Sequence, residues 1–204
     1  LCLACETDFV AQNSEFAASA NAILEIAAAA DAADTAALLA VKNAEGHTVE
    51  EMVTEKSGQT GEKVELAYYA RVEASFINAY VHFNKKLGTM LGFSKPVSEE
   101  VAHTIAMQAT AMAPISIDVD DCPADVVAHE KTIALEQMKQ DPKNANKPEA
   151  ILEKIAEGKM RKFFEENTLL NQTLVGEKET IREYLAKADK DVKIVAYKRF
   201  ALEA

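Results

Sequence analysis

The amino-acid sequence predicts an α+β fold, in which two related subdomains each place helices on an antiparallel sheet. Apolar residues alternate with polar ones over 64–72 and 192–202, as they do on a half-buried strand. Over 98–112 they recur every three or four residues, as on one face of a helix. A helical pattern followed by strand patterns occurs once on each side of about Ser94, which indicates the relation between the two halves.

Residues 1–93 form the predicted N-terminal subdomain. Capping signals predict its helices, because a short polar side chain can accept the free N–H groups of a first turn. One helix begins at Asn13–Ser14, and another runs from Thr48 through Glu55, with Glu51 as the capping-box partner. The strands of this subdomain are predicted to form a three-stranded antiparallel meander over 64–72, 75–83 and 87–93.

The predicted C-terminal subdomain combines two segments, 94–122 and 167–204. Ser98 caps its first helix, and Pro114 ends that helix because proline lacks a backbone N–H. A strand over 192–202 closes the chain.

Residues 123–166 lie between those two segments and are predicted to form a helical hairpin. Pro123 and Pro148 open its two helices, since proline suits the first turn of a helix. A polar turn over 141–146 joins them, so the helices are expected to be antiparallel, as in a coiled coil.

The composition argues against several classes of function. A formal net charge of −11 opposes binding to nucleic acid, which needs Lys and Arg to neutralise phosphates. No apolar run approaches the roughly 20 residues that a membrane-spanning helix needs. Cys2, Cys5 and Cys122 lack the spacing of a disulfide framework or of a complete zinc motif, and reduced cysteines indicate a cytoplasmic location. No nucleotide-binding glycine motif occurs, so neither a cofactor nor a metal is expected.

The segment Thr7–Val10 is the candidate functional site, and two interpretations compete for it. Phe9 and Val10 would be core residues if the chain simply turns there from a strand into a helix. Alternatively, the segment is a loop that presents Asp8 and Phe9 to a partner protein. General considerations from the residues alone favour the core interpretation.

The residues Cys5–Asn13, Cys-Glu-Thr-Asp-Phe-Val-Ala-Gln-Asn, resemble the signature of the elongation factor Ts family. Members of that family are guanine nucleotide exchange factors for elongation factor Tu. Further resemblances follow in the family's order along essentially the whole chain, at Thr60–Val64, Tyr80–His82 with Leu87–Gly88, Ile105–Gln108, Glu157–Phe163 and Leu170–Gln172.

The resemblance implies a factor that binds elongation factor Tu carrying GDP, disturbs its Mg²⁺ site and promotes GDP release. It implies no catalytic residue, so the protein is not expected to be an enzyme. The family also carries an N-terminal helical domain that this sequence lacks, and Leu1 opens directly into a strand-like run, so upstream residues are expected. The residues that the resemblance assigns to contact with elongation factor Tu are Thr7, Asp8, Phe9, Val10, Thr60 and His82.

Some positions depart from the family or keep alternatives open. Thr60 stands where the family has an isoleucine, and Phe83–Lys86 stands where relatives have small residues and an arginine. His82 has a second interpretation as an exposed strand histidine. For the hairpin over 123–166, the family implies a homodimer or a partner contact, and packing onto the chain's own core is the alternative. Two other functions remain, a module that binds Tu-like GTPases without stimulating exchange and a hydrolase with a carboxylate pair.

Overall fold

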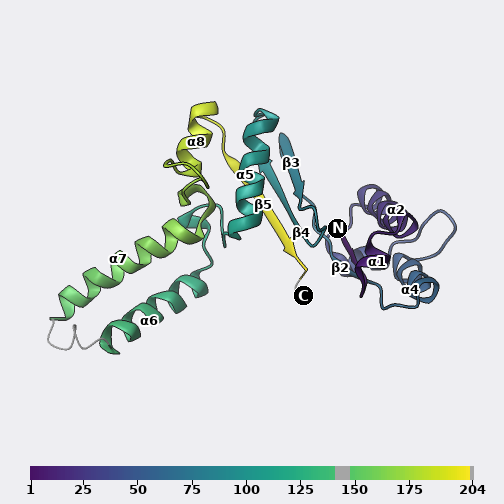
Figure 1. Cartoon of the computed structure of the whole chain (residues 1–204), viewed down its shortest axis with the longest axis horizontal. Helices are drawn as coiled ribbons and strands as arrows, with labels where there is room; N and C mark the ends of the chain where they lie inside the picture. Colours follow the sequence, from purple (N-terminus) through teal and green to yellow (C-terminus); the bar gives the residue numbers. More distant parts are fainter. Residues whose placement is uncertain (141–147, 203–204) are drawn as a thin grey trace. The chain divides into compact units, whose positions relative to one another are not determined.

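The computed structural model describes residues 1–140 and 148–202, and it confirms the predicted α+β class (Figure 1). The chain forms two compact units, Leu1–Arg71 and Val72–Ala204. The predicted turn over 141–146 lies outside the described residues. Within the described ranges, no helix is both long enough and apolar enough to cross a membrane.

The first unit packs its helices around a small two-stranded sheet. Its elements are β1 (Cys2–Ala4), α1 (Asp8–Ala11), α2 (Ser14–Ala30), α3 (Thr35–Leu39), α4 (Val49–Thr60) and β2 (Glu65–Tyr68). Strands β1 and β2 are antiparallel, with Leu3 opposite Leu66. Ile23, Leu38 and Val49 are almost fully buried and form the centre of the core.

The predicted caps explain where two of these helices begin. The Oδ1 atom of Asn13 accepts the N–H of Glu15 at 2.7 Å, which starts α2. Thr48 and Glu51 form both hydrogen bonds of the predicted capping box at the start of α4. Helix α4 runs beyond the predicted end to Thr60, and Gly61 then ends it in the left-handed region at φ 72°.

The second unit is built on a three-stranded antiparallel sheet in the order β3–β4–β5. Its elements are β3 (Phe76–Val81), β4 (Leu87–Phe93), α5 (Glu99–Met112), the 3-10 helix η1 (Val119–Asp121), α6 (Ala124–Gln140), α7 (Glu149–Asn167), the 3-10 helix η3 (Leu169–Asn171), α8 (Ile181–Ala188) and β5 (Ile194–Ala201). Leu91, Phe93, Ile105, Leu169 and Ile181 are fully buried and belong to one core.

The predicted meander over 64–72, 75–83 and 87–93 is wrong. Strand β2 pairs with β1 at the start of the chain, and β4 pairs with β3 and with the C-terminal β5. Strand β2 is therefore paired inside the first unit and does not extend the β3–β4 hairpin. Both strands of that hairpin belong to the second unit, so the division falls after Arg71, earlier than the expected boundary at residue 93.

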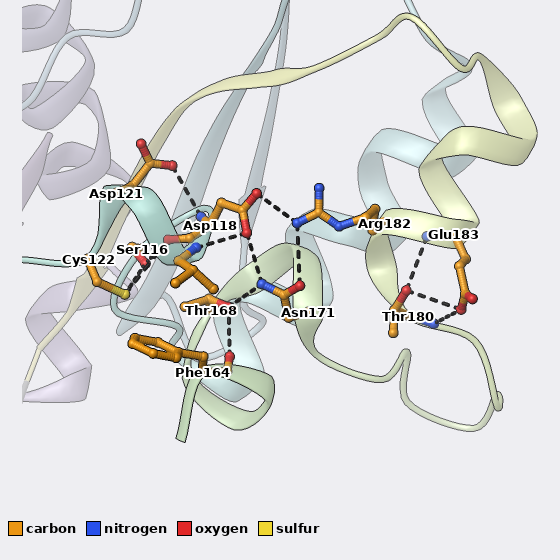
Figure 2. Close-up of polar contacts among 11 residues, drawn as sticks. Ser116, Asp118, Asp121, Cys122, Phe164, Thr168, Asn171, Thr180, Arg182 and Glu183 are labelled. Carbon is orange, nitrogen blue, oxygen red and sulfur yellow. Dashed lines mark hydrogen bonds and ion pairs between the residues drawn. The ribbon is translucent and has the colours of Figure 1, made fainter. Parts of the chain in front are cut away.

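Helices α6 and α7 lie side by side, and a polar network ties their base to α8 (Figures 1 and 2). The carboxylate of Asp118 accepts hydrogen bonds from Arg182 Nη2 at 2.7 Å, Asn171 Nδ2 at 2.9 Å and the Val119 N–H at 2.8 Å. Burial raises the pKa of Asp118, but these hydrogen bonds outweigh it and hold the pKa below its ordinary value. The network therefore connects η1, which precedes α6, with η3, which follows α7.

Candidate partner-binding site

The candidate segment Thr7–Val10 is a single helical turn and not the loop that was expected. Thr7 is the N-cap of α1, and its Oγ1 accepts the N–H of Val10 at 3.4 Å. The carbonyl oxygens of Thr7 and Asp8 accept the N–H groups of Ala11 and Gln12, at 3.2 and 3.0 Å. The turn joins β1 to α2, so its position is set at both ends by regular structure.

The side chains of this turn point to different environments. Phe9 is 91% exposed, so the interpretation of Phe9 as a core residue is wrong. Val10 is half-buried and packs against the core of the first unit, so that interpretation holds for Val10 in part. Asp8 is exposed beside Phe9. The turn thus anchors itself through one apolar side chain and leaves a larger one in water.

Glu62, which lies just after α4 and far from Thr7 in the sequence, holds the start of the turn by hydrogen bonds. Its Oε2 accepts the N–H groups of Glu6 and Thr7 at 3.1 and 3.0 Å, and its Oε1 accepts the hydroxyl of Thr7 at 2.5 Å. The hydrogen bond from the Thr7 hydroxyl is the main reason that the pKa of Glu62 lies below its ordinary value. Glu62 lies within the segment that matched the family, but no local pattern linked it to Thr7.

Thr60, the last residue of α4, uses its hydroxyl within the chain. The Oγ1 of Thr60 donates to the carbonyl oxygen of Lys56 at 2.9 Å and accepts the N–H of Glu62 at 3.3 Å. The side chain is half-buried. Thr60 is therefore hydrogen-bonded to Glu62, the residue that holds the Thr7 turn. The contact of Thr60 with a partner stays a prediction.

His82 belongs to the second unit, whereas the other five candidate residues belong to the first. It follows β3 in the turn to β4, with its Nδ1 at 3.0 Å from the hydroxyl of Tyr80. Its ring centroid lies 4.5 Å from that of Phe83, which is 88% exposed. Half-buried and paired with Tyr80, His82 differs from the freely exposed strand histidine of the alternative interpretation.

The described residues offer no metal site of the usual composition. Across residues 1–140 and 148–202, no three His, Cys, Asp or Glu side chains come together in a group that could hold a metal ion. Cys2, Cys5 and Cys122 are free thiols. Burial raises the pKa of Cys2 and Cys5, and for Cys5 the charge of Glu62 adds to the effect. At neutral pH both thiols therefore carry less of the reactive thiolate than an ordinary cysteine does.

Comparison with known proteins agrees with the resemblance. The family model described as elongation factor TS matches residues 6–204. The elongation factor Ts of Porphyromonas gingivalis is 37% identical over 203 residues, which cover 99% of this chain and 73% of that protein. The elongation factor Ts of Christiangramia forsetii is 35% identical over 203 residues, covering 98% and 72%. That of Thermobifida fusca is 38% identical over 192 residues, covering 91% and 67%.

Similarity of this extent defines the chain as a translation elongation factor. More particularly, the chain belongs to the elongation factor Ts family.

Proposed function

We propose that this protein is a guanine nucleotide exchange factor that binds elongation factor Tu carrying GDP, disturbs its Mg²⁺ site and promotes GDP release. The observation that supports the proposal most is the exposure of Phe9, 91%, on a turn whose backbone is held by hydrogen bonds. Because the backbone before Phe9 is already held, the main chain does not have to become ordered when the exposed ring enters a partner.

The physical requirement for exchange is a difference in affinity. A GTPase holds GDP largely through Mg²⁺ and the loop that surrounds the phosphates. A factor that binds the nucleotide-free form more tightly than the GDP form weakens GDP binding by the same ratio, because coupling between two ligands is reciprocal. The factor must also enter while GDP is still bound, and a short protruding turn beside the Mg²⁺ site can do so.

Each residue of the turn has a distinct part in this mechanism. Burial of the Phe9 side chain in the partner contributes about 2–3 kcal/mol of binding free energy, which can displace structure near the Mg²⁺. Asp8, exposed beside it, accepts hydrogen bonds from partner groups and sets the orientation. Thr7 and Val10 fix the turn to its own unit. No covalent bond is made or broken, so the protein needs no catalytic residue and no cofactor of its own.

The second unit supplies the other proposed contacts. His82, held by Tyr80, is proposed to contact elongation factor Tu through the β3–β4 turn. Helices α6 and α7 are proposed to act as a coiled-coil hairpin for a partner or a second copy of the chain. The support for that role is an open groove lined by Leu135, Leu152 and Met160. A cytoplasmic location fits this function.

Release of fluorescent GDP from elongation factor Tu tests the proposal. The chain is expected to accelerate release, and Phe9→Ala is expected to reduce its effectiveness by about 30-fold or more, as burial of a phenylalanine implies. Leu24→Ala is the matched control, because Leu24 is an exposed apolar residue on α2 of the same unit. Release by Phe9→Ala at the parent's rate would contradict the role of Phe9. Binding without acceleration would favour a module that binds the GTPase but does not stimulate exchange.

A further inference from the structure

We propose that Glu62 is a positioning residue that preorganises the turn carrying Phe9 for the partner GTPase. The inference rests on the proposed function, because it assumes that Phe9 enters elongation factor Tu. Glu62 would act through the geometry of the turn and would not itself touch the partner. Its role is to keep the backbone just before Phe9 in the bound conformation while the protein is free.

The geometry of the carboxylate supports this role. Both oxygens of Glu62 are used, and the three donors come from two successive residues, Glu6 and Thr7. The hydroxyl of Thr7 donates to Glu62 and at the same time accepts the N–H of Val10. A continuous chain of hydrogen bonds therefore runs from Glu62 through Thr7 into the first turn of α1.

The turn benefits from such support because its own packing is slight, with Val10 only half-buried against the core of the first unit. Helix α1 has four residues, none of them buried, and a single helical turn is unstable by itself in water. Phe9 contributes almost no packing, since it is 91% exposed. If the turn were disordered in the free protein, it would lose conformational entropy on binding. The cost for each residue that became ordered would weaken affinity by about fivefold or more. A preorganised turn avoids that loss.

The chain also fixes Glu62 itself. Gly61 adopts the left-handed conformation at φ 72°, which turns the chain out of α4, and Thr60 accepts the Glu62 N–H. Two backbone N–H groups and one hydroxyl donate to the carboxylate, which can accept all three because neither of its oxygens is a donor. In Glu62→Gln an NH₂ group would replace one oxygen, and the negative charge that strengthens all three hydrogen bonds would be lost. The Thr7 hydroxyl would then have to rotate and accept from the NH₂ group, or one backbone N–H would lose its acceptor.

A double-mutant cycle separates positioning from direct contact. If Glu62 acts only by placing Phe9, removing Phe9 makes the identity of residue 62 nearly irrelevant. If Glu62 touches the partner independently, the two losses multiply. Glu55→Gln is the matched control, because it makes the same charge change at an exposed position on α4.

The experiment measures the affinity of each variant for nucleotide-free elongation factor Tu by titration, together with acceleration of fluorescent GDP release. Glu62→Gln is expected to weaken binding about tenfold, with the release rate at saturation within about twofold of the parent. In the Phe9→Ala background the same substitution is expected to change affinity less than about threefold. Glu55→Gln is expected to stay within about twofold of the parent in both measurements.

Thr7→Val tests the same inference should Glu62→Gln fold poorly, because it removes the hydroxyl that links Glu62 to the N–H of Val10. It is expected to weaken binding about threefold to tenfold. Parent-like affinity in both variants, or an equal loss with and without Phe9, would overturn the inference. Binding that depends on Glu62 without faster GDP release would contradict the exchange function alone. Absence of any binding by the parent chain would overturn both.

Discussion

Phe9 and Phe93 show two ways in which this chain fixes a phenylalanine. Phe93, at the end of β4, is fully buried, and its ring lies 6.0 Å from that of Phe76. Phe9, on α1, is 91% exposed, and hydrogen bonds to Glu62 hold the backbone that carries it. Packing therefore fixes the side chain of Phe93, whereas polar contacts fix only the main chain before Phe9.

The difference teaches that stability and partner binding are separable in this protein. A side chain that makes few contacts in its own unit contributes little to folding, so its apolar surface stays free for another molecule. The polar contacts that support it can be changed one at a time. We expect substitutions at the two positions to have opposite profiles, one affecting folding and the other affecting binding.

The largest expected effect is that of Phe93→Ala on stability. Removing this buried ring leaves a cavity in the second unit and is expected to lower the free energy of unfolding by about 3–5 kcal/mol. Phe9→Ala is expected to change it by less than about 0.5 kcal/mol. Urea denaturation followed by circular dichroism measures both. A loss in Phe9→Ala comparable with that in Phe93→Ala would break the comparison.

A smaller effect is expected beside Phe93, at Gly92. A Cβ there would lie 2.8 Å from the Cβ of Ala74 and 3.0 Å from that of Ala196. Gly92→Ala is therefore expected to destabilise the second unit by about 1–3 kcal/mol, because the packed neighbours must move. Gly158→Ala, in α7 with open space around the added carbon, is expected to be stabilising by about 0.5–1 kcal/mol. Thermal denaturation of both variants checks the opposite signs.

The sequence predicted local structure well where a single segment decides it. The caps at Asn13, Thr48 and Ser98 begin helices as expected, because a cap depends on residues only two or three positions apart. The sequence does not predict that β2 pairs with β1 and not with β3. Strand pairing depends on contacts between segments far apart in the sequence, which a local pattern does not contain.

The candidate site shows the same limit. The resemblance drew attention to Phe9, but only the structure shows its exposure, since a strand-to-helix junction is equally compatible with a core side chain. Glu62 was missed because its contact with Thr7 joins residues far apart in sequence. The resemblance also predicts a partner contact at Thr60; its hydroxyl is hydrogen-bonded within the chain, which no local sequence pattern indicates, and the contact stays a prediction.

A pH-dependent effect is expected at Asp118, whose network ties the base of α6 and α7 to α8. The folded-state pKa of Asp118 lies below its ordinary value, so its stabilisation is present above about pH 4 and is lost as pH falls through the lower folded value. Asp118→Asn is expected to lower stability by about 1–2 kcal/mol at neutral pH. Melting curves near neutral pH and near about pH 3 should show that the difference between variant and parent shrinks in acid. A constant difference would contradict the role of the charge.

The smallest expected effects concern the caps of α1 and α4. Thr48→Ala removes a complete capping box from a 12-residue helix and is expected to be destabilising by about 1 kcal/mol. Thr7→Val removes the cap of a four-residue turn at the surface and is expected to change stability by less than about 0.5 kcal/mol. If Thr7→Val nevertheless weakens partner binding, the residues that stabilise the fold and those that support binding are clearly different. Urea denaturation and affinity titration of the same samples provide both values.

The most direct test of the central claim places 4-fluorophenylalanine at position 9 and records its ¹⁹F resonance. In the free protein the resonance should show the full difference between H₂O and D₂O that a side chain in water gives. On addition of nucleotide-free elongation factor Tu, the resonance should move and that difference should largely disappear. A complex in which the fluorine at position 9 keeps its solvent-exposed signal would contradict the claim that Phe9 enters the partner.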